Sequence, residues 1–271
     1  MSVKTILITG ATDGIGKQTA TELARQGARV LVHGRDKAKG IQVLDAINRD
    51  NCNEKLALYL ADFTSLAEVA RLAEEVKREQ AQLHVLINNA GIFSKERVLT
   101  NDGFESTFAV NHLAPFLLTL LLLDLLKASA PARIVNVASG SHRGVSAVDF
   151  DNLQGEKTYD GIAAYSLSKL GNVLFTNALA RRLAGTHVTA NSLHPGVIGT
   201  KLLRASYNMD GANLEEGAQT SVYLAASPEA EGVTGKYYSK MLEKPTSDLA
   251  QDEALQEKFW QVSEALVAKF L

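Results

Sequence analysis

Thr9-Gly10-Ala11-Thr12-Asp13-Gly14-Ile15-Gly16 follows an apolar run at residues 5–9 and leads into an amphipathic stretch at 16–26. Its glycines have the spacing G-x-x-x-G-x-G, at the turn between a predicted strand and a predicted helix. Glycines at such a turn let the backbone approach a pyrophosphate, whose charge then meets the amino terminus of the helix. The alternative is a tight turn without a ligand, because glycines are common between strands and helices. The position at the start of the chain favours a nucleotide site.

The rest of the chain repeats this order of strand and helix. Strands are predicted at residues 5–9, 29–33, 56–60, 85–88, 133–138, 188–193 and 236–239. Helices are predicted at 16–26, 37–49, 66–80, 104–126, 163–183 and 215–226, with a further helical pattern at 249–271 that is expected to pack on the same domain. Strands that alternate with crossover helices form a parallel sheet covered on both faces. We therefore predict one doubly wound α/β domain, residues 1–271, with a seven-stranded parallel sheet and its binding groups at the carboxyl ends of the strands.

Composition and charge exclude several classes of protein. Of the 271 residues, 46% are hydrophobic and 21% are charged, which is a globular balance. The net charge of −2 leaves no positive excess for a phosphate backbone, so we expect no nucleic-acid partner. The single cysteine, Cys52, excludes an intrachain disulfide and a cysteine-rich zinc site. No group of His, Asp and Glu has metal-ligand spacing either, so we predict no metal.

The most apolar stretch of the sequence is 113–126. It is shorter than the ~20 residues that a membrane helix needs, and Pro115 and Asp124 interrupt it. The amino terminus leads directly into the apolar residues 6–8, which are too few for the core of a signal peptide. We therefore expect a cytoplasmic protein without a membrane span.

The ordered motifs of the chain resemble those of the short-chain dehydrogenases/reductases, whose nucleotide motif has the form T-G-x-x-x-G-x-G. The family's later motifs follow in order as Asp62, Asn88-Asn89-Ala90-Gly91, Asn111, Ser139, Tyr165-Ser166-Leu167-Ser168-Lys169 and Pro195-Gly196. The chain is most similar to the retinol-dehydrogenase-like group, through Phe108-Ala109-Val110-Asn111-His112-Leu113, Val135-Asn136-Val137-Ala138-Ser139, Ser166-Leu167-Ser168-Lys169-Leu170-Gly171-Asn172, Gly235-Lys236-Tyr237-Tyr238 and Trp260. The resemblance implies a Rossmann-type fold and an NAD(P)-dependent alcohol dehydrogenase or carbonyl reductase.

Tyr165 and Lys169 are four residues apart, so on a helix they share a face one turn apart. A phenol with a pKa of about 10 is a poor base at neutral pH, and a neighbouring ammonium group lowers that pKa. The alternative is a solvated pair on a helix surface, but Ser139 at the end of a predicted strand favours catalysis. By resemblance, Tyr165 exchanges the proton of the substrate oxygen, Lys169 holds the nicotinamide ribose and Ser139 orients that oxygen. Asn111 would anchor a water in a proton relay from Lys169; otherwise it is a helix-interior amide.

The resemblance also implies a set of cofactor contacts that runs along the chain. They are Gly10, Thr12, Asp13, Gly14, Ile15, Gly16, Arg35, Asp62, Phe63, Asn89, Ala90, Gly91, Tyr165, Lys169, Pro195, Gly196, Val197 and Thr200. Asp62 would accept a hydrogen bond from the adenine amino group with Phe63 beside it; alternatively, Asp62 caps the helix that follows. Thr200 would bond the nicotinamide carboxamide.

The predicted strand 29–33 is followed by Gly34-Arg35-Asp36. In this fold an acidic residue at the end of the second strand bonds the ribose 2′-hydroxyl, whereas a nearby arginine accommodates a 2′-phosphate. Family alignment places the acidic position at Gly34, and the planar guanidinium of Arg35 suits a phosphate. We expect Asp36 to cap the helix 37–49, although it becomes the acidic residue if the strand ends two residues later. The sequence therefore predicts that NADP(H) is preferred over NAD(H).

The segments 140–163 and 197–214 are expected to contact the substrate, and 197–214 resembles the mobile loop that covers the substrate in the family. Neither carries a fixed charge cluster, so we predict an uncharged, fairly apolar carbonyl or alcohol substrate. The alternative function is a nucleotide-binding redox sensor without turnover, which has no need of Ser139, Tyr165 and Lys169. By resemblance the helices 104–126 and 163–183 would pair in a homodimer or homotetramer; alternatively, they only cover the sheet.

Overall fold

The computed structural model describes residues 3–51 and 55–271, and Cys52 lies outside these residues. Within them it contains one sheet with the order β3-β2-β1-β4-β5-β6-β7-β8. The strands are β1 Thr5–Ile8, β2 Arg29–Gly34, β3 Leu56–Leu60, β4 Val85–Asn88, β5 Ala132–Val137, β6 Val188–His194, β7 Tyr237–Ser239 and β8 Leu242–Glu243. The first seven pair in parallel, which confirms the predicted Rossmann-like α/β sheet. The prediction of seven strands misses β8, a two-residue antiparallel strand that follows a turn at Lys240 and Met241, both with positive φ.

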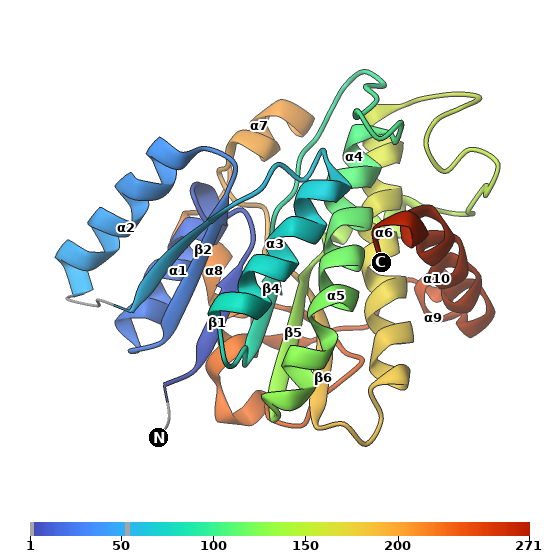
Figure 1. Cartoon of the computed structure of the whole chain (residues 1–271). Coiled ribbons are helices and arrows are strands. Elements are labelled where there is room, and N and C mark those ends of the chain that lie inside the picture. Colours follow the sequence, from blue (N-terminus) through green and yellow to red (C-terminus); the bar gives the residue numbers. More distant parts are fainter. Residues whose placement is uncertain (1–2, 52–54) are drawn as a thin grey trace.

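Helices cover both faces of the sheet (Figure 1). They are α1 Gly14–Arg25, α2 Lys37–Asn51, α3 Leu66–Glu79, α4 Ser106–Phe108, α5 Ala114–Ala128, α6 Gly161–Arg182, α7 Lys201–Tyr207, α8 Leu214–Ala226, α9 Asp248–Gln251 and α10 Glu253–Val267. One hydrophobic core lies between the sheet and α3, α5 and α6, and a second lies between the sheet and α1, α2 and α8. In α3, Val69, Leu72, Ala73 and Val76 are buried at the spacing of one helical face.

The predicted helix at 104–126 is interrupted. It begins as the short α4, continues as a π-helical turn over Ala109–Leu113, and then becomes α5. The whole helical stretch Ser106–Ala128 is long and apolar enough to cross a membrane, so the sequence argument from length is wrong. However, 72% of its most apolar window is buried inside the protein, as in the core helix of a globular fold. Within the described residues, this helix is therefore a buried part of the core.

The last helices pack on the domain as expected. In α10, Phe259 and Trp260 are buried, and the Trp260 ring lies 5.0 Å from the Phe116 ring and 5.8 Å from the Phe175 ring. Arg182 of α6 also forms an ion pair with Glu257 at 2.7 Å. The helix α10 therefore covers part of α6. The homodimer or homotetramer stays a prediction, and its contacts would have to involve the part of α6 that α10 does not cover.

Candidate active site

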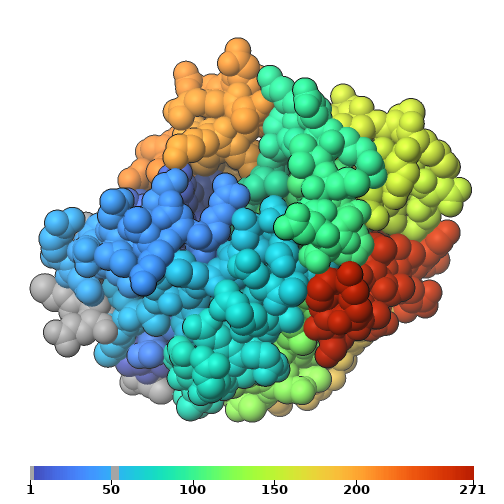
Figure 2. All heavy atoms as spheres, turned by 45° about the horizontal axis from the view of Figure 1, so that its top comes forward, coloured from blue at the N-terminus to red at the C-terminus, as the bar shows by residue number. Residues whose placement is uncertain are grey.

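A cavity of about 770 Å³ opens at the carboxyl ends of the parallel strands, next to the amino terminus of α1. Figure 2 shows this end of the molecule, where the amino-terminal part (blue), the segment after β4 (green) and α7 (orange) meet. The cavity is lined by every residue predicted to contact the cofactor, from Gly10 to Thr200, and by Ser139. Asn111 is buried beneath it.

The glycine turn is shaped by backbone crowding. Gly10 and Gly14 adopt positive φ angles of 64° and 54°, a region that favours glycine. A Cβ on Gly16 would lie 2.4 Å from the Gly10 carbonyl oxygen, so no side chain fits there. Asp13 caps α1, because its Oδ1 accepts the Gly14 N–H at 2.8 Å. The helix amino terminus thus faces the cavity without side chains in the way, which fits the pyrophosphate of a dinucleotide.

Three polar side chains hold this turn against the neighbouring strands. Asn89 Nδ2 donates to the Thr9 carbonyl at 2.8 Å, and Thr9 Oγ1 accepts the backbone N–H groups of Asn89 and Ala90. His33 Nδ1 accepts the Gly10 N–H at 3.2 Å, while its Nε2 lies 3.1 Å from the Ala61 carbonyl. Burial lowers the pKa of His33 to about 4, so the ring stays neutral and keeps both roles at neutral pH.

The adenosine side of the cavity contains Asp62 and Phe63, and the Phe63 ring stacks on His33 at 4.4 Å. Asp62 Oδ1 accepts the Thr64 N–H at 2.9 Å. The alternative role of Asp62 as a helix cap is wrong, because α3 begins after Ser65 and the Ser65 side chain caps it. The Asp62 carboxylate therefore belongs to the turn that borders the cavity.

The end of β2 lies beside the cavity. The strand ends at Gly34, one residue later than expected, and a Cβ there would lie 2.4 Å from Thr12 Cγ2. Asp36 Oδ1 accepts the Lys39 N–H at 3.1 Å, so Asp36 caps α2 as predicted. Arg35 and Lys39 both line the cavity and bring two positive charges to this side.

Three of the four predicted catalytic side chains meet at the end of β5. Tyr165 and Lys169 lie one turn apart on α6 and are 6% and 3% exposed. Lys169 Nζ donates to the Val137 carbonyl at 2.9 Å and lies 5.6 Å from the centre of the Tyr165 ring. Ser139, the second residue after β5, lies beside the Tyr165 hydroxyl and influences its pKa.

Burial controls the protonation of this group. It raises the pKa of Tyr165 above its ordinary value, and the hydrogen bond with Ser139 only partly opposes that effect. The expectation that Lys169 brings the Tyr165 pKa down toward neutrality does not hold here, since burial outweighs other influences. Burial also lowers the pKa of Lys169 to about 8. At pH 7 the site therefore contains a protonated phenol beside an ammonium group, which suits donation of a proton to a carbonyl oxygen.

Asn111 lies in the π-helical turn rather than in a regular helix. Its Oδ1 accepts the Ile92 N–H at 2.7 Å, and its Nδ2 donates to the Ile92 carbonyl and to Ser168 Oγ, both at 3.0 Å. A Cβ on Gly91 would lie 3.4 Å from Asn111 Oδ1 and 3.5 Å from Lys169 Nζ, so both atoms border the same glycine. The amide thus anchors the segment after β4, and its part in a proton relay stays a prediction.

The segment 197–214 contains a helix that the sequence analysis missed. Thr200 caps α7, with its Oγ1 accepting the Leu203 N–H at 3.2 Å. Lys201 pairs with Asp13 at 2.6 Å across the cavity, so α7 is fastened to the glycine turn. All seven residues of α7, each described by the structure, are half-buried or exposed. A short helix held in this way is suited to act as a lid.

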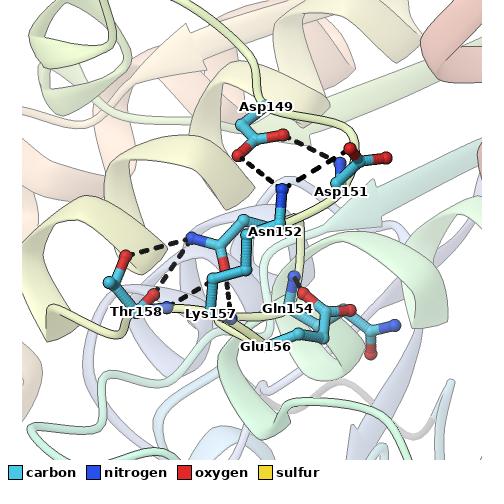
Figure 3. A network of polar contacts seen from close by, with 7 residues as sticks. All are labelled: Asp149, Asp151, Asn152, Gln154, Glu156, Lys157 and Thr158. Atoms are coloured by element: carbon cyan, nitrogen blue, oxygen red, sulfur yellow. Dashed lines mark hydrogen bonds and ion pairs between the residues drawn. The ribbon is translucent and has the colours of Figure 1, made fainter.

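The segment before α6 forms a compact polar loop (Figure 3). The network is made by Asp149, Asp151, Asn152, Gln154, Glu156, Lys157 and Thr158. Lys157 lies 3.5 Å from Asp149 and 3.4 Å from Asp151, and Asn152 Oδ1 accepts the Lys157 N–H at 2.7 Å. The loop ends at Asp160, whose side chain caps α6. The end of this loop therefore fixes where α6 begins, and with it the position of Tyr165 one turn later.

Several cavity residues were not singled out from the sequence. They are His33, Lys39, Thr64, Ile92, Ser141, Tyr207 and Met209. Ser141 could have been predicted from the sequence, because it comes two residues after Ser139 at the end of a predicted strand. Tyr207 could not, because its position depends on how α7 folds back over the sheet.

Comparison with known proteins agrees with this site. A family profile described as short chain dehydrogenase matches residues 4–211. Retinol dehydrogenase 14 of Homo sapiens is 43% identical, over 98% of this chain and 87% of that protein. Retinol dehydrogenase 12 of Bos taurus is 44% identical, over 96% and 85%. An uncharacterized protein from Mycobacterium paratuberculosis has a similar solved structure, with a TM-score of 0.80 and 34% identity over 98% of this chain and 93% of that one. The RhlG/NADP active-site complex of Pseudomonas aeruginosa has a TM-score of 0.72 and 25% identity, over 88% and 94%.

The fold, the site and these relatives define an oxidoreductase that acts on CH–OH groups and uses a nicotinamide cofactor. The chain belongs to the short-chain dehydrogenase family. Among its relatives, the retinol dehydrogenases named above cover nearly its whole length.

We expect Gly14→Val to weaken NADPH binding by about 100-fold or more, because a β-branched residue is strained at positive φ. The new side chain would also enter the space between the turn and Thr200, whose Cγ2 lies 3.7 Å from the added Cβ. Fluorescence titration with NADPH measures the dissociation constant. Gly27→Val is the matched control, because Gly27 has a φ of 85° with nothing within 4 Å of its Cβ. Equal NADPH affinity in both variants would show that the glycine turn is not where the cofactor binds.

Proposed function

We propose that this protein uses NADPH to reduce an uncharged, fairly apolar carbonyl compound, with Tyr165 as the general acid. The single observation that carries the proposal is the buried Tyr165, which lines the cavity beside Ser139, one helical turn from the buried ammonium group of Lys169. When bound, the nicotinamide supplies the hydride, and the protein orients and polarises the substrate.

Three residues of the chain bind the substrate oxygen and transfer the proton. Ser139 and Tyr165 would both donate hydrogen bonds to the carbonyl oxygen, which increases the positive charge on its carbon. The Tyr165 proton then passes to that oxygen as the alcohol forms. Lys169, fixed by the Val137 carbonyl, stabilises the phenolate that is left. The raised pKa of Tyr165 keeps its hydroxyl protonated at neutral pH, which is the form that donates a proton in the reduction.

The preference for NADP(H) rests on charge at the end of β2. Arg35 and Lys39 both line the cavity there, and Gly34 has no side chain to repel a phosphate. Asp36 is engaged as the cap of α2. The similarity to the RhlG complex with NADP adds support for this choice.

The apolar character of the substrate is supported by apolar residues in the cavity lining. They include Ile92, Val197, Leu202, Leu203 and Met209. The retinol dehydrogenases among the relatives are named for an apolar alcohol, which agrees with such a wall. We also propose a cytoplasmic location, since sparse cysteine suits a reducing compartment.

Replacing Tyr165 with Phe removes only the hydroxyl that donates the proton. We expect turnover of a carbonyl substrate with NADPH to fall by about 10²–10⁴-fold, the range for a positioned acid or base, while NADPH affinity stays close to wild type. The control is Tyr223→Phe, on α8 and outside the cavity lining, which should keep full activity. A Tyr165→Phe variant that retains more than about a tenth of wild-type turnover contradicts the general-acid role.

Arg35→Ala should weaken NADPH far more than NADH. Loss of a charge-assisted contact to the 2′-phosphate predicts that the NADPH-to-NADH ratio of kcat/KM falls about 10- to 100-fold. Arg49→Ala, near the far end of α2, should leave the ratio unchanged. An unchanged ratio in Arg35→Ala, or equal use of both cofactors by the wild type, contradicts the proposed preference.

A further inference from the structure

Four hydroxyl groups follow one another along the wall of the cavity. Tyr165 and Ser139 lie beside each other in the cavity lining, and Ser139 Oγ lies 3.1 Å from Ser141 Oγ. Ser141 Oγ lies in turn 3.1 Å from the Tyr207 hydroxyl. All four residues line the same cavity. The reduction step uses only the first pair, Tyr165 and Ser139, and gives no role to the second.

The second pair lies where Tyr207 is partly exposed, and Leu203 and Met209 line the same cavity. Ser141 and Tyr207 hydrogen-bond to each other. A hydroxyl has one donor and two acceptor positions. The pair therefore keeps the capacity to bind one further oxygen atom presented by a ligand.

Ser141 is fixed relative to the reacting position, because its backbone N–H donates to Ser139 Oγ at 3.2 Å. Tyr207 comes from a different element, as the last residue of α7. The ion pair between Lys201 and Asp13 fastens the other end of this helix to the glycine turn. The second pair is thus complete only where α7 lies over the cavity, as it does here.

We propose that Ser141 and Tyr207 form a second oxygen subsite, which binds an oxygen on the carbon next to the reacting carbonyl. Ligand oxygens bonded to Ser139 and to Ser141 would be separated by about the 3.1 Å between the two serine oxygens. Two oxygens on adjacent carbons match this separation when they point to the same side. The preferred substrates are then apolar vicinal dicarbonyl or α-hydroxy carbonyl compounds. This inference rests on the proposed function, because the first pair must bind the reacting oxygen.

Acenaphthenequinone and acenaphthenone provide a matched pair of rigid, apolar probes. They share one ring skeleton, and the quinone carries a second carbonyl oxygen on the adjacent carbon. The measured quantity is the ratio of kcat/KM for the quinone to that for the monoketone, with NADPH and with product quantified by chromatography. We expect Tyr207→Phe and Ser141→Ala each to lower this ratio by about 3- to 10-fold, the effect of one neutral hydrogen bond. The intrinsic reactivity of the two ketones cancels when the ratio is compared between variants.

Tyr223→Phe on α8 makes the same chemical change outside the cavity lining and should leave the ratio at the wild-type value. Tyr207 is 39% exposed, so the loss of its hydroxyl should not impair folding. If both cavity variants lower the two rates equally or not at all, the second pair does not recognise the additional oxygen. The inference is then wrong, while the proposed function stands. If the wild type reduces neither ketone in a Tyr165-dependent way, the proposed function fails and the inference fails with it.

Discussion

Burial of the Lys169 ammonium group is the constraint on which the rest of the site depends. A cation that is only 3% exposed is costly unless a polar group satisfies it, and the Val137 carbonyl does so at 2.9 Å. This bond joins the middle of α6 to the end of β5. Because Tyr165 lies one turn earlier on α6 and Ser139 lies two residues beyond Val137, the same bond brings their hydroxyls together. The acid that the proposed reaction needs is therefore a consequence of how one helix meets one strand.

The cofactor side is built mainly from backbone. Thr9 and Asn89 join the ends of β1 and β4 by hydrogen bonds, and Gly10 and Gly16 leave no room for side chains beside them. The result is a surface that a pyrophosphate can approach at the amino terminus of α1. The lid α7 is different, since polar contacts from its two ends fasten it to the cavity. A rigid glycine turn and a lid held by a few polar contacts suit a protein that must release its product after each turnover.

Local patterns in the sequence predicted most of the fold and the centre of the site. The glycine turn, the parallel strands and the spacing of Tyr165 and Lys169 each depend on residues close together in the chain. Other features depend on contacts between distant segments. The π-helical turn at Asn111 is bonded to Ile92, nineteen residues earlier, and Tyr207 meets Ser141 only after α7 folds over the sheet. The raised pKa of Tyr165 could not be predicted either, because its main cause is burial by the whole fold.

The central claim is that hydride reaches the substrate carbon directly while Tyr165 supplies the proton to oxygen. The most direct measurement is reduction of acenaphthenone in ordinary water with NADPH deuterated at both transferable positions, followed by mass spectrometry of the alcohol. The account predicts one deuterium on the carbinol carbon of each product molecule from the wild-type protein. An alcohol that carries only protium at that carbon would contradict it.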